Sequence, residues 1–76
     1  MPDQKEWEDR VKGLLKAELK RRGVTYAQLV EKLAEIGVKE TEPNVRNKLA
    51  RGKFTAVFMV QCLEAVGCTS LRLSES

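Results

Sequence analysis

Helix caps and glycine stops divide this chain into four segments, and this punctuation limits the fold to a small helical bundle. A residue that can cap a helix stands at Asp3, Thr25, Thr41 and Thr55, and a glycine follows each segment at Gly23, Gly37, Gly52 and Gly67. A capping side chain accepts a hydrogen bond from an N–H of the first turn, and glycine ends a helix in the left-handed conformation. The pattern predicts helices over residues 3–22, 25–36, 41–51 and 55–66, in an all-α fold of four, or at most five, helices.

Apolar residues at three- and four-residue steps predict which faces form the core. The stripes comprise Trp7, Val11, Leu14, Leu15 and Leu19, then Leu29, Val30, Leu33, Ala34 and Ile36, then Val45 and Leu49. Gly13 interrupts the first stripe, either as a weak point or as a close helix crossing. Residues 54–63 carry no charge, so the fourth helix is expected to be buried on most sides, or to face a partner subunit in part.

The 76 residues are expected to form one domain, with a tail at residues 68–76. Leu71 and Leu73 alternate with Ser70 and Arg72, a pattern typical of a short β-strand or an extended arm. Such an arm either packs back on the helices or pairs across a dimer. A domain this small is only marginally stable by itself, so dimerisation or tight helix packing is expected.

Composition argues against several classes of protein. No apolar run is long enough to span a membrane, and the N-terminus lacks a signal region, so the expected location is the cytoplasm. With no histidine, and with Cys62 and Cys68 in an uncommon spacing, we expect neither a metal site nor a cofactor. Cys62 is interpreted as a core residue. Without a candidate base or a phosphate-binding loop, we expect no enzymatic activity.

The positive charge of the chain is concentrated between residues 41 and 53. This stretch has four basic residues and one acidic residue, which accounts for the net charge of +3 of the whole chain. With Val45 and Leu49 turned to the core, the opposite face is centred on Asn47. The spacing predicts that no acid balances these basic residues at i±4, which disfavours a merely solvated surface helix. Lys20–Arg22 complement the dipole of the first helix or, alternatively, contact phosphate.

The arrangement of these segments resembles the lambda-repressor-like (Cro/C1, XRE-type) helix-turn-helix domains. The matching residues are T-Y-A-Q-L-V-E-K-L from Thr25, G-V at Gly37, the apolar Val45 and Leu49, and R-G-K from Arg51. Three extra residues stand between Leu33 and Gly37, and the stretch from Gly37 to Gly52 is also longer by about three, which predicts that the second and third helices are nearly a turn longer than usual. The motif N-V-R-N-K-L-A-R-G-K-F also resembles a small bacterial family of uncharacterised proteins. The resemblance implies a DNA-binding, helical bundle whose third helix enters the major groove.

On this basis we expect a sequence-specific reader of double-stranded DNA that regulates transcription. Asn44 and Asn47 would read adenine, and Arg46 or Arg51 guanine. Lys48 and Lys53 would contact phosphate, and Thr25 would bond a phosphate through its N–H, cap its helix, or do both. The complete set of candidate DNA-binding residues is Thr25, Gln28, Pro43, Asn44, Arg46, Asn47, Lys48, Arg51 and Lys53.

Two further expectations concern protein partners. Readers of this size usually act as dimers, so a homodimer through the fourth helix or the Leu71–Leu73 tail is expected. The alternative function is a protein-interaction module of the adaptor or antitoxin type, which would use the apolar helix at residues 55–66 and the tail. No effector domain is evident, so the sequence does not support regulation by a small molecule.

Overall fold

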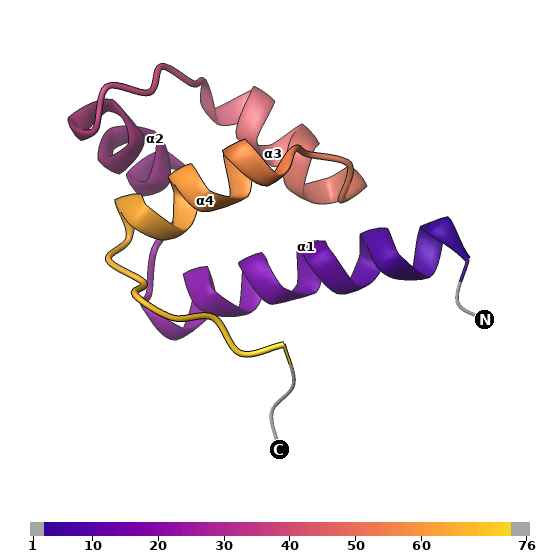
Figure 1. Cartoon of the computed structure of the whole chain (residues 1–76). Helices are drawn as coiled ribbons and strands as arrows, with labels where there is room; N and C mark the ends of the chain where they lie inside the picture. Colours follow the sequence, from indigo (N-terminus) through magenta and orange to yellow (C-terminus); the bar gives the residue numbers. More distant parts are fainter. Residues whose placement is uncertain (1–2, 74–76) are drawn as a thin grey trace.

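Residues 3–73, the part of the chain described by the computed structural model, form four α-helices and no β-strand (Figure 1). The helices are α1 (Gln4–Arg21), α2 (Tyr26–Glu35), α3 (Glu42–Arg51) and α4 (Ala56–Ala65). The all-α prediction is confirmed, and each helix lies within the range expected from its cap and its glycine. Residues 68–73 are neither helix nor strand, so no β-strand forms there, and residues 74–76 of the expected tail lie outside the described residues.

All four expected N-caps form. The side chains of Asp3, Thr25, Thr41 and Thr55 each accept a hydrogen bond from the backbone N–H three residues further on. At α2 the capping box is complete, because the Thr25 N–H also donates to Gln28 Oε1 at 2.9 Å. These bonds satisfy N–H groups that have no partner inside the helix. Local chemistry therefore sets where each helix starts.

The turn between α2 and α3 begins at a glycine stop. Gly37 has a φ of +84°, and its N–H donates to the carbonyl of Ala34, while the Val38 N–H donates to the carbonyl of Leu33. This pair of bonds is the Schellman motif, which needs a residue in the left-handed region. The turn then runs through residues 38–41. α2 and α3 are each ten residues long.

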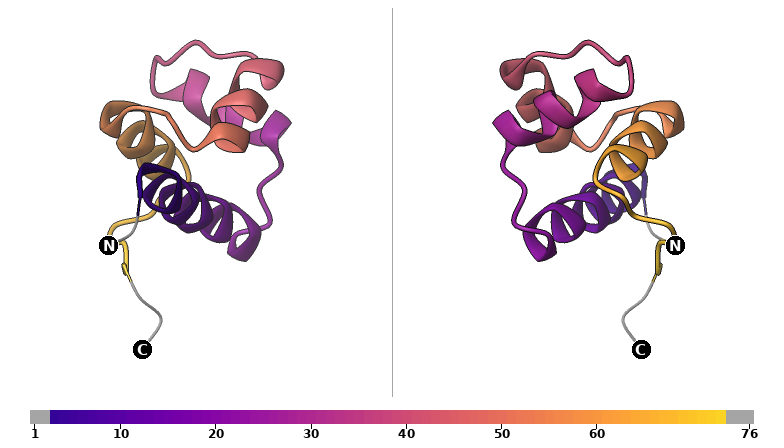
Figure 2. Two further views of the ribbon diagram at one scale, coloured as in Figure 1. Left: turned by 90° about the vertical axis from the view of Figure 1, so that its right-hand side faces the viewer. Right: turned by 90° about the vertical axis from the view of Figure 1, so that its left-hand side faces the viewer.

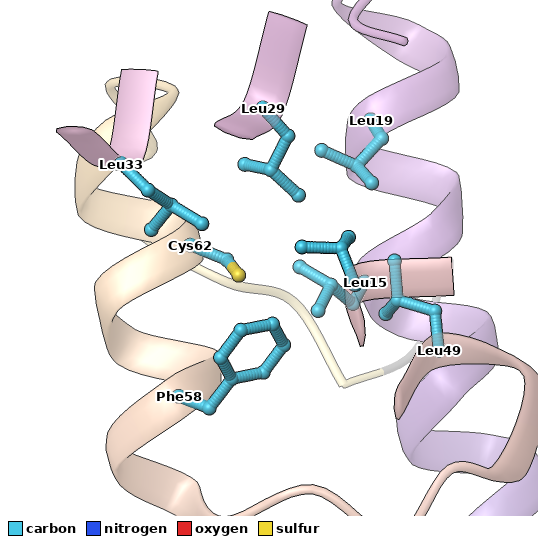
Figure 3. Packing of buried hydrophobic residues seen from close by; sticks show 8 residues of the cluster. Leu15, Leu19, Leu29, Leu33, Leu49, Phe58 and Cys62 are labelled. Atoms are coloured by element: carbon cyan, nitrogen blue, oxygen red, sulfur yellow. The ribbon is translucent and has the colours of Figure 1, made fainter. Parts of the chain in front are cut away.

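The core lies where the four helices meet. α1 packs against α3 and α4, and α2 packs against the same two helices. Viewed roughly along α1, α4 lies to one side and α2 and α3 lie to the other (Figure 2). The buried cluster draws on every helix and consists of Leu15, Leu19, Leu29, Leu33, Val45, Leu49, Phe58 and Cys62 (Figure 3).

Several residues expected in the core lie at the surface. Trp7 and Ile36 are about half exposed, and Ala34 is exposed as well. The N-terminal turns of α1 extend past the other helices (Figure 1), and Trp7 lines a surface hollow together with residues 52–54 of the turn from α3 to α4. Ile36 is the C-cap residue of α2 and follows its last turn. Tyr26, which does not belong to the apolar stripe predicted for the second helix, is partly buried and packs against the core.

Of the two interpretations of Gly13, the structure excludes a close helix crossing, and a contact of that kind occurs at a different glycine. Nothing lies within 4 Å of the position where a Cβ would stand on Gly13. Gly52, in contrast, is buried, and a Cβ there would collide with the backbone carbonyl of Glu8 in α1. Lys12 in α1 also donates from Nζ to the carbonyl of Ala50 at 3.1 Å. Both contacts fix the C-terminal end of α3 against α1.

The fourth helix is not buried on most sides. Phe58 and Cys62 point into the core, but Val57 and Val60 are 66% and 63% exposed. Buried and exposed apolar residues therefore lie on opposite faces of an uncharged stretch. Burial on most sides is wrong because the small bundle covers only one face of α4, and the alternative, that part of α4 faces a partner subunit, stays a prediction.

Candidate nucleic-acid interface

The outward face of α3 presents polar side chains that the core leaves accessible. Val45 and Leu49 are completely buried, and this orients the opposite face toward solvent. The candidate residues exposed on or just after α3 are Pro43, Asn44, Arg46, Asn47, Arg51 and Lys53. The expected orientation of the helix is confirmed.

Arg46, in contrast to the sequence-based expectation, has an acidic partner on its own helix. Its Nη2 lies 2.7 Å from Oε1 of Glu42, one turn earlier, and its guanidinium lies over the Tyr26 ring at 5.7 Å from the centroid. The statement that no acid balances the basic residues at i±4 is therefore wrong for Arg46. Glu42 also provides the negative charge that favours the first turn of α3.

Lys48 is bound into the structure more firmly than Arg46. Its Nζ lies 2.7 Å from Oε2 of Glu40, whose side chain is only 12% exposed, and 4.4 Å from the centroid of the Phe58 ring. Glu40 belongs to the turn before α3, so this ion pair ties the turn to the helix. Moving Lys48 to a phosphate would leave a largely buried carboxylate without its partner, which is costly.

Arg51 and Lys53 keep their charge available. Among residues 3–73, no carboxylate lies within ion-pair distance of either side chain. Arg51 ends α3, and Lys53 follows the αL residue Gly52. The positive charge of the stretch is thus concentrated at the C-terminal end of α3, while Asn44 and Asn47 occupy its first two turns.

Thr25 and Gln28 are exposed, but they form hydrogen bonds with each other. The Thr25 N–H, considered above for a phosphate, already donates to the Gln28 side chain, and the Thr25 hydroxyl accepts from the Gln28 N–H at 3.1 Å. Of the two roles considered for Thr25, the structure shows the cap.

The basic end of α1 has a structural role that the sequence analysis did not identify. Glu18 is buried and pairs with both Arg21 and Arg22, and Arg22 Nη1 also donates to the carbonyl of Val66 at 3.0 Å. The hydrogen bond from Arg22, helped by the positive charges of both arginines, lowers the pKa of Glu18, although burial opposes that shift. Arg22 therefore joins the end of α1 to the end of α4.

The two cysteines differ in environment. Cys62 is completely buried in the core, as expected, and burial raises the pKa of its thiol to about 12, with a smaller contribution from Glu40. Cys68 is half-buried, and its thiol donates to the carbonyl of Ser70. Within residues 3–73 no group of His, Cys, Asp or Glu side chains is arranged to hold a metal ion. No helix in this part of the chain is long and apolar enough to cross a membrane.

Sequence spacing could have identified one of these partners but not the others. Glu42 and Arg46 stand four residues apart in one helix, where opposite charges meet. Glu40 and Lys48 are joined across the start of α3, and Lys12 reaches Ala50 from another helix. Contacts of the latter kind depend on how the elements pack.

Comparison with known proteins identifies one relationship. A domain family of unknown function, DUF6471, matches residues 7–71, which include all four helices except the first three residues of α1. No curated protein and no solved structure matches the chain. The matched range covers most of the chain, and the protein therefore belongs to the DUF6471 family.

Proposed function

We propose that this protein binds double-stranded DNA in a sequence-specific manner and regulates transcription, with α2 and α3 acting as a helix-turn-helix. The observation that carries the proposal is the outward face of α3. It combines exposed amide and guanidinium donors with no acidic side chain along its centre, and its buried Val45 and Leu49 anchor it to the core. A helix with these properties can enter the major groove, which is wide enough to admit it.

The positions of the candidate residues along α3 suggest which of them contact bases and which contact phosphates. Asn44 and Asn47 lie in the first two turns, where side chains of a recognition helix reach base edges, so we assign them to adenine. Arg51 ends the helix and Lys53 follows it, which suits phosphate contacts beside the groove. These two cations would position the protein, and the two asparagines would supply the sequence preference.

The ion pairs decide which other basic residues can take part. Arg46 and Glu42 are both substantially exposed, so separating them costs less than about 1 kcal/mol, and Arg46 can turn to DNA. Lys48 pairs with the largely buried Glu40, so separating this pair costs more, and we expect Lys48 to stay bound to Glu40. We therefore remove Lys48 from the set of DNA contacts and keep Arg46.

Binding to random duplex DNA, measured by fluorescence anisotropy at several salt concentrations, tests the proposal. With phosphates neutralised by Arg46, Arg51 and Lys53, the slope of log K against log[salt] should be about −3 per protomer. Arg51→Ala should reduce this slope by about one. Arg72→Ala is the matched control, because it removes the same charge from the exposed tail, which lies across α1 from α3 (Figure 1). Absence of binding at low salt, or a flat salt response, contradicts the proposal.

Selection of bound sequences from a random duplex pool tests the readers separately. Asn47→Ala should remove the preference at one base position and leave the salt slope unchanged. If Asn47→Ala instead weakens binding equally for all sequences, Asn47 is no base reader. An identical selected motif for wild type and variant would lead to the same conclusion.

A second candidate function, a protein-interaction module, is favoured by one observation. Val57 and Val60 leave an apolar strip of α4 open to solvent. Isolated surface hydrophobics need no explanation, but two neighbours on one helical face suggest a contact surface. A chain that shows no DNA binding at low salt but associates through α4 would support this alternative.

A further inference from the structure

A groove of about 740 Å³ runs between α1 and residues 70–73 of the tail. Residues at three- and four-residue steps along α1 form one wall, and the tail forms the other, on the side of α1 that faces away from α3 (Figure 1). Arg10 fixes the tail there, because its Nη2 donates to the carbonyl of Leu73 at 3.2 Å. The volume lies within the roughly 300–1,000 Å³ that is usual for small-molecule sites.

Both carboxylates that line this α1–tail groove are already paired. Asp9 has a carboxylate oxygen 3.6 Å from Nζ of Lys5 and the other 3.5 Å from Nζ of Lys12. Glu18, which is buried, pairs with both arginines at the end of α1. The negative charge of each carboxylate is therefore balanced within the protein.

Two arginines of the groove keep their charge available. Among residues 3–73, neither Arg10 nor Arg72 has a carboxylate within ion-pair distance. Arg10 uses one N–H on Leu73 and lies over the Trp7 ring at 5.6 Å from the centroid, which leaves its other N–H groups for a ligand. Guanidinium groups bind carboxylate and phosphate through paired N–H donors. The groove is thus suited to an anion.

The floor of the groove is apolar and includes a glycine that packing does not explain. Leu14 and Leu71 are half-buried there, and Gly13 and Ala17 are exposed. Gly13 lowers the stability of α1, in whose middle it stands, and nothing lies within 4 Å of its Cβ position. No contact with the described chain therefore requires a glycine, whereas a bound molecule that approaches the helix backbone would.

We propose that the α1–tail groove binds a small amphipathic anion, an organic carboxylate or phosphate with an apolar body. The acidic head lies at Arg10 and Arg72, and the body covers the floor at Gly13. This site goes beyond the proposed function and needs no DNA, because the groove faces away from α3. No motif in the sequence marks it, since the tail becomes the second wall only when it folds along α1.

Titration of the isotope-labelled full chain, followed by its amide chemical shifts, tests the proposal. The probes are octanoate and octyl phosphate, and the tighter of the two identifies the preferred head. A dissociation constant on the order of 1 mM is expected for molecules of this size. The shifts should saturate and be largest at Gly13, Ala17 and Leu71.

Acetate and octanol serve as control molecules, because acetate lacks the apolar body and octanol lacks the charge. Both should bind more weakly than the tighter probe by about fivefold or more. If neither probe gives a saturating response, the proposal is overturned. A control molecule that binds as tightly as the probes also overturns it, since the groove would then recognise only one half of the ligand.

Removal of the two available arginines tests the position of the head. Arg10→Ala and Arg72→Ala should each weaken binding of the tighter probe by about fivefold or more, because each removes a charged hydrogen-bond donor. Lys16→Ala is the matched control: Lys16 is an exposed cation of α1 that does not line the groove, so the affinity should stay near that of wild type. Equal losses in all three variants would show an effect of net charge alone and contradict the proposed site.

Gly13→Leu separates a ligand site from a structural role. Leucine favours a helix over glycine, and nothing within 4 Å obstructs its Cβ, so the midpoint of urea denaturation should rise. The same side chain occupies the floor of the groove and should weaken binding by about tenfold or more. A more stable Gly13→Leu variant that binds the probe as tightly as wild type would place the ligand elsewhere and overturn the proposal.

Discussion

Gly52→Ala should destabilise the protein through two separate effects. Gly52 has a φ of +68°, which an L-residue adopts at a cost of roughly 1–2 kcal/mol. In addition, the new methyl group would collide with the backbone carbonyl oxygen of Glu8 and stand 3.3 Å from Cβ of Lys12. A backbone atom cannot turn aside as a side chain can, so α1 and α3 must separate, at a further cost of about 1–3 kcal/mol.

Gly23→Ala provides the matched control for this experiment. Gly23 has almost the same φ, +66°, but nothing lies within 4 Å of its Cβ position. Gly23→Ala should therefore reduce the free energy of unfolding only by the cost of the left-handed conformation, roughly 1–2 kcal/mol. The difference between the two variants isolates the contact between α3 and α1.

Urea denaturation measures both variants. Circular dichroism reports the helices, and the fluorescence of Trp7, the single tryptophan, reports the region of Gly52, since both residues line the same surface hollow. The midpoint should fall further for Gly52→Ala than for Gly23→Ala, with an unchanged m-value. Equal losses in the two variants would refute the inference that Gly52 is required for close helix contact.

Three other perturbations test individual contacts. Because its pKa is lowered, Glu18 contributes stability above its ordinary pKa of 4.5 and loses that contribution as the pH falls below it. Glu18→Gln should reduce the free energy of unfolding by about 1–3 kcal/mol at neutral pH, and urea denaturation should show that this free energy depends less on pH in the acid range. Cys68 should react with a thiol reagent in the native protein at pH 8, whereas Cys62, with a pKa of about 12, should react only on unfolding; equal native rates would contradict its burial. Lys48→Met should cost roughly 1–3 kcal/mol in thermal denaturation because it strands Glu40, and Glu40→Gln in the same chain should recover part of that loss.

The sequence by itself determined the helices and the direction in which α3 faces. A cap bonds an N–H three residues away, and a glycine stop bonds carbonyls of the preceding turn, so both signals lie within a few residues. The burial of Val45 and Leu49 follows from helical periodicity in the same way. Local features of this kind can be read without knowing how the helices pack.

Only the tertiary structure decided which charges of the basic stretch are available. A count of charges does not distinguish among the four basic residues of this stretch. In the folded chain Arg46 pairs with Glu42 and Lys48 pairs with Glu40, whereas Arg51 and Lys53 have no such partner among the described residues. The folded chain also makes its close helix contact at Gly52 and not at Gly13, and it leaves one side of α4 uncovered. The pair of Lys48 with Glu40 and the contact of Gly52 with α1 join segments whose proximity arises when the helices dock, and no spacing along the chain encodes them.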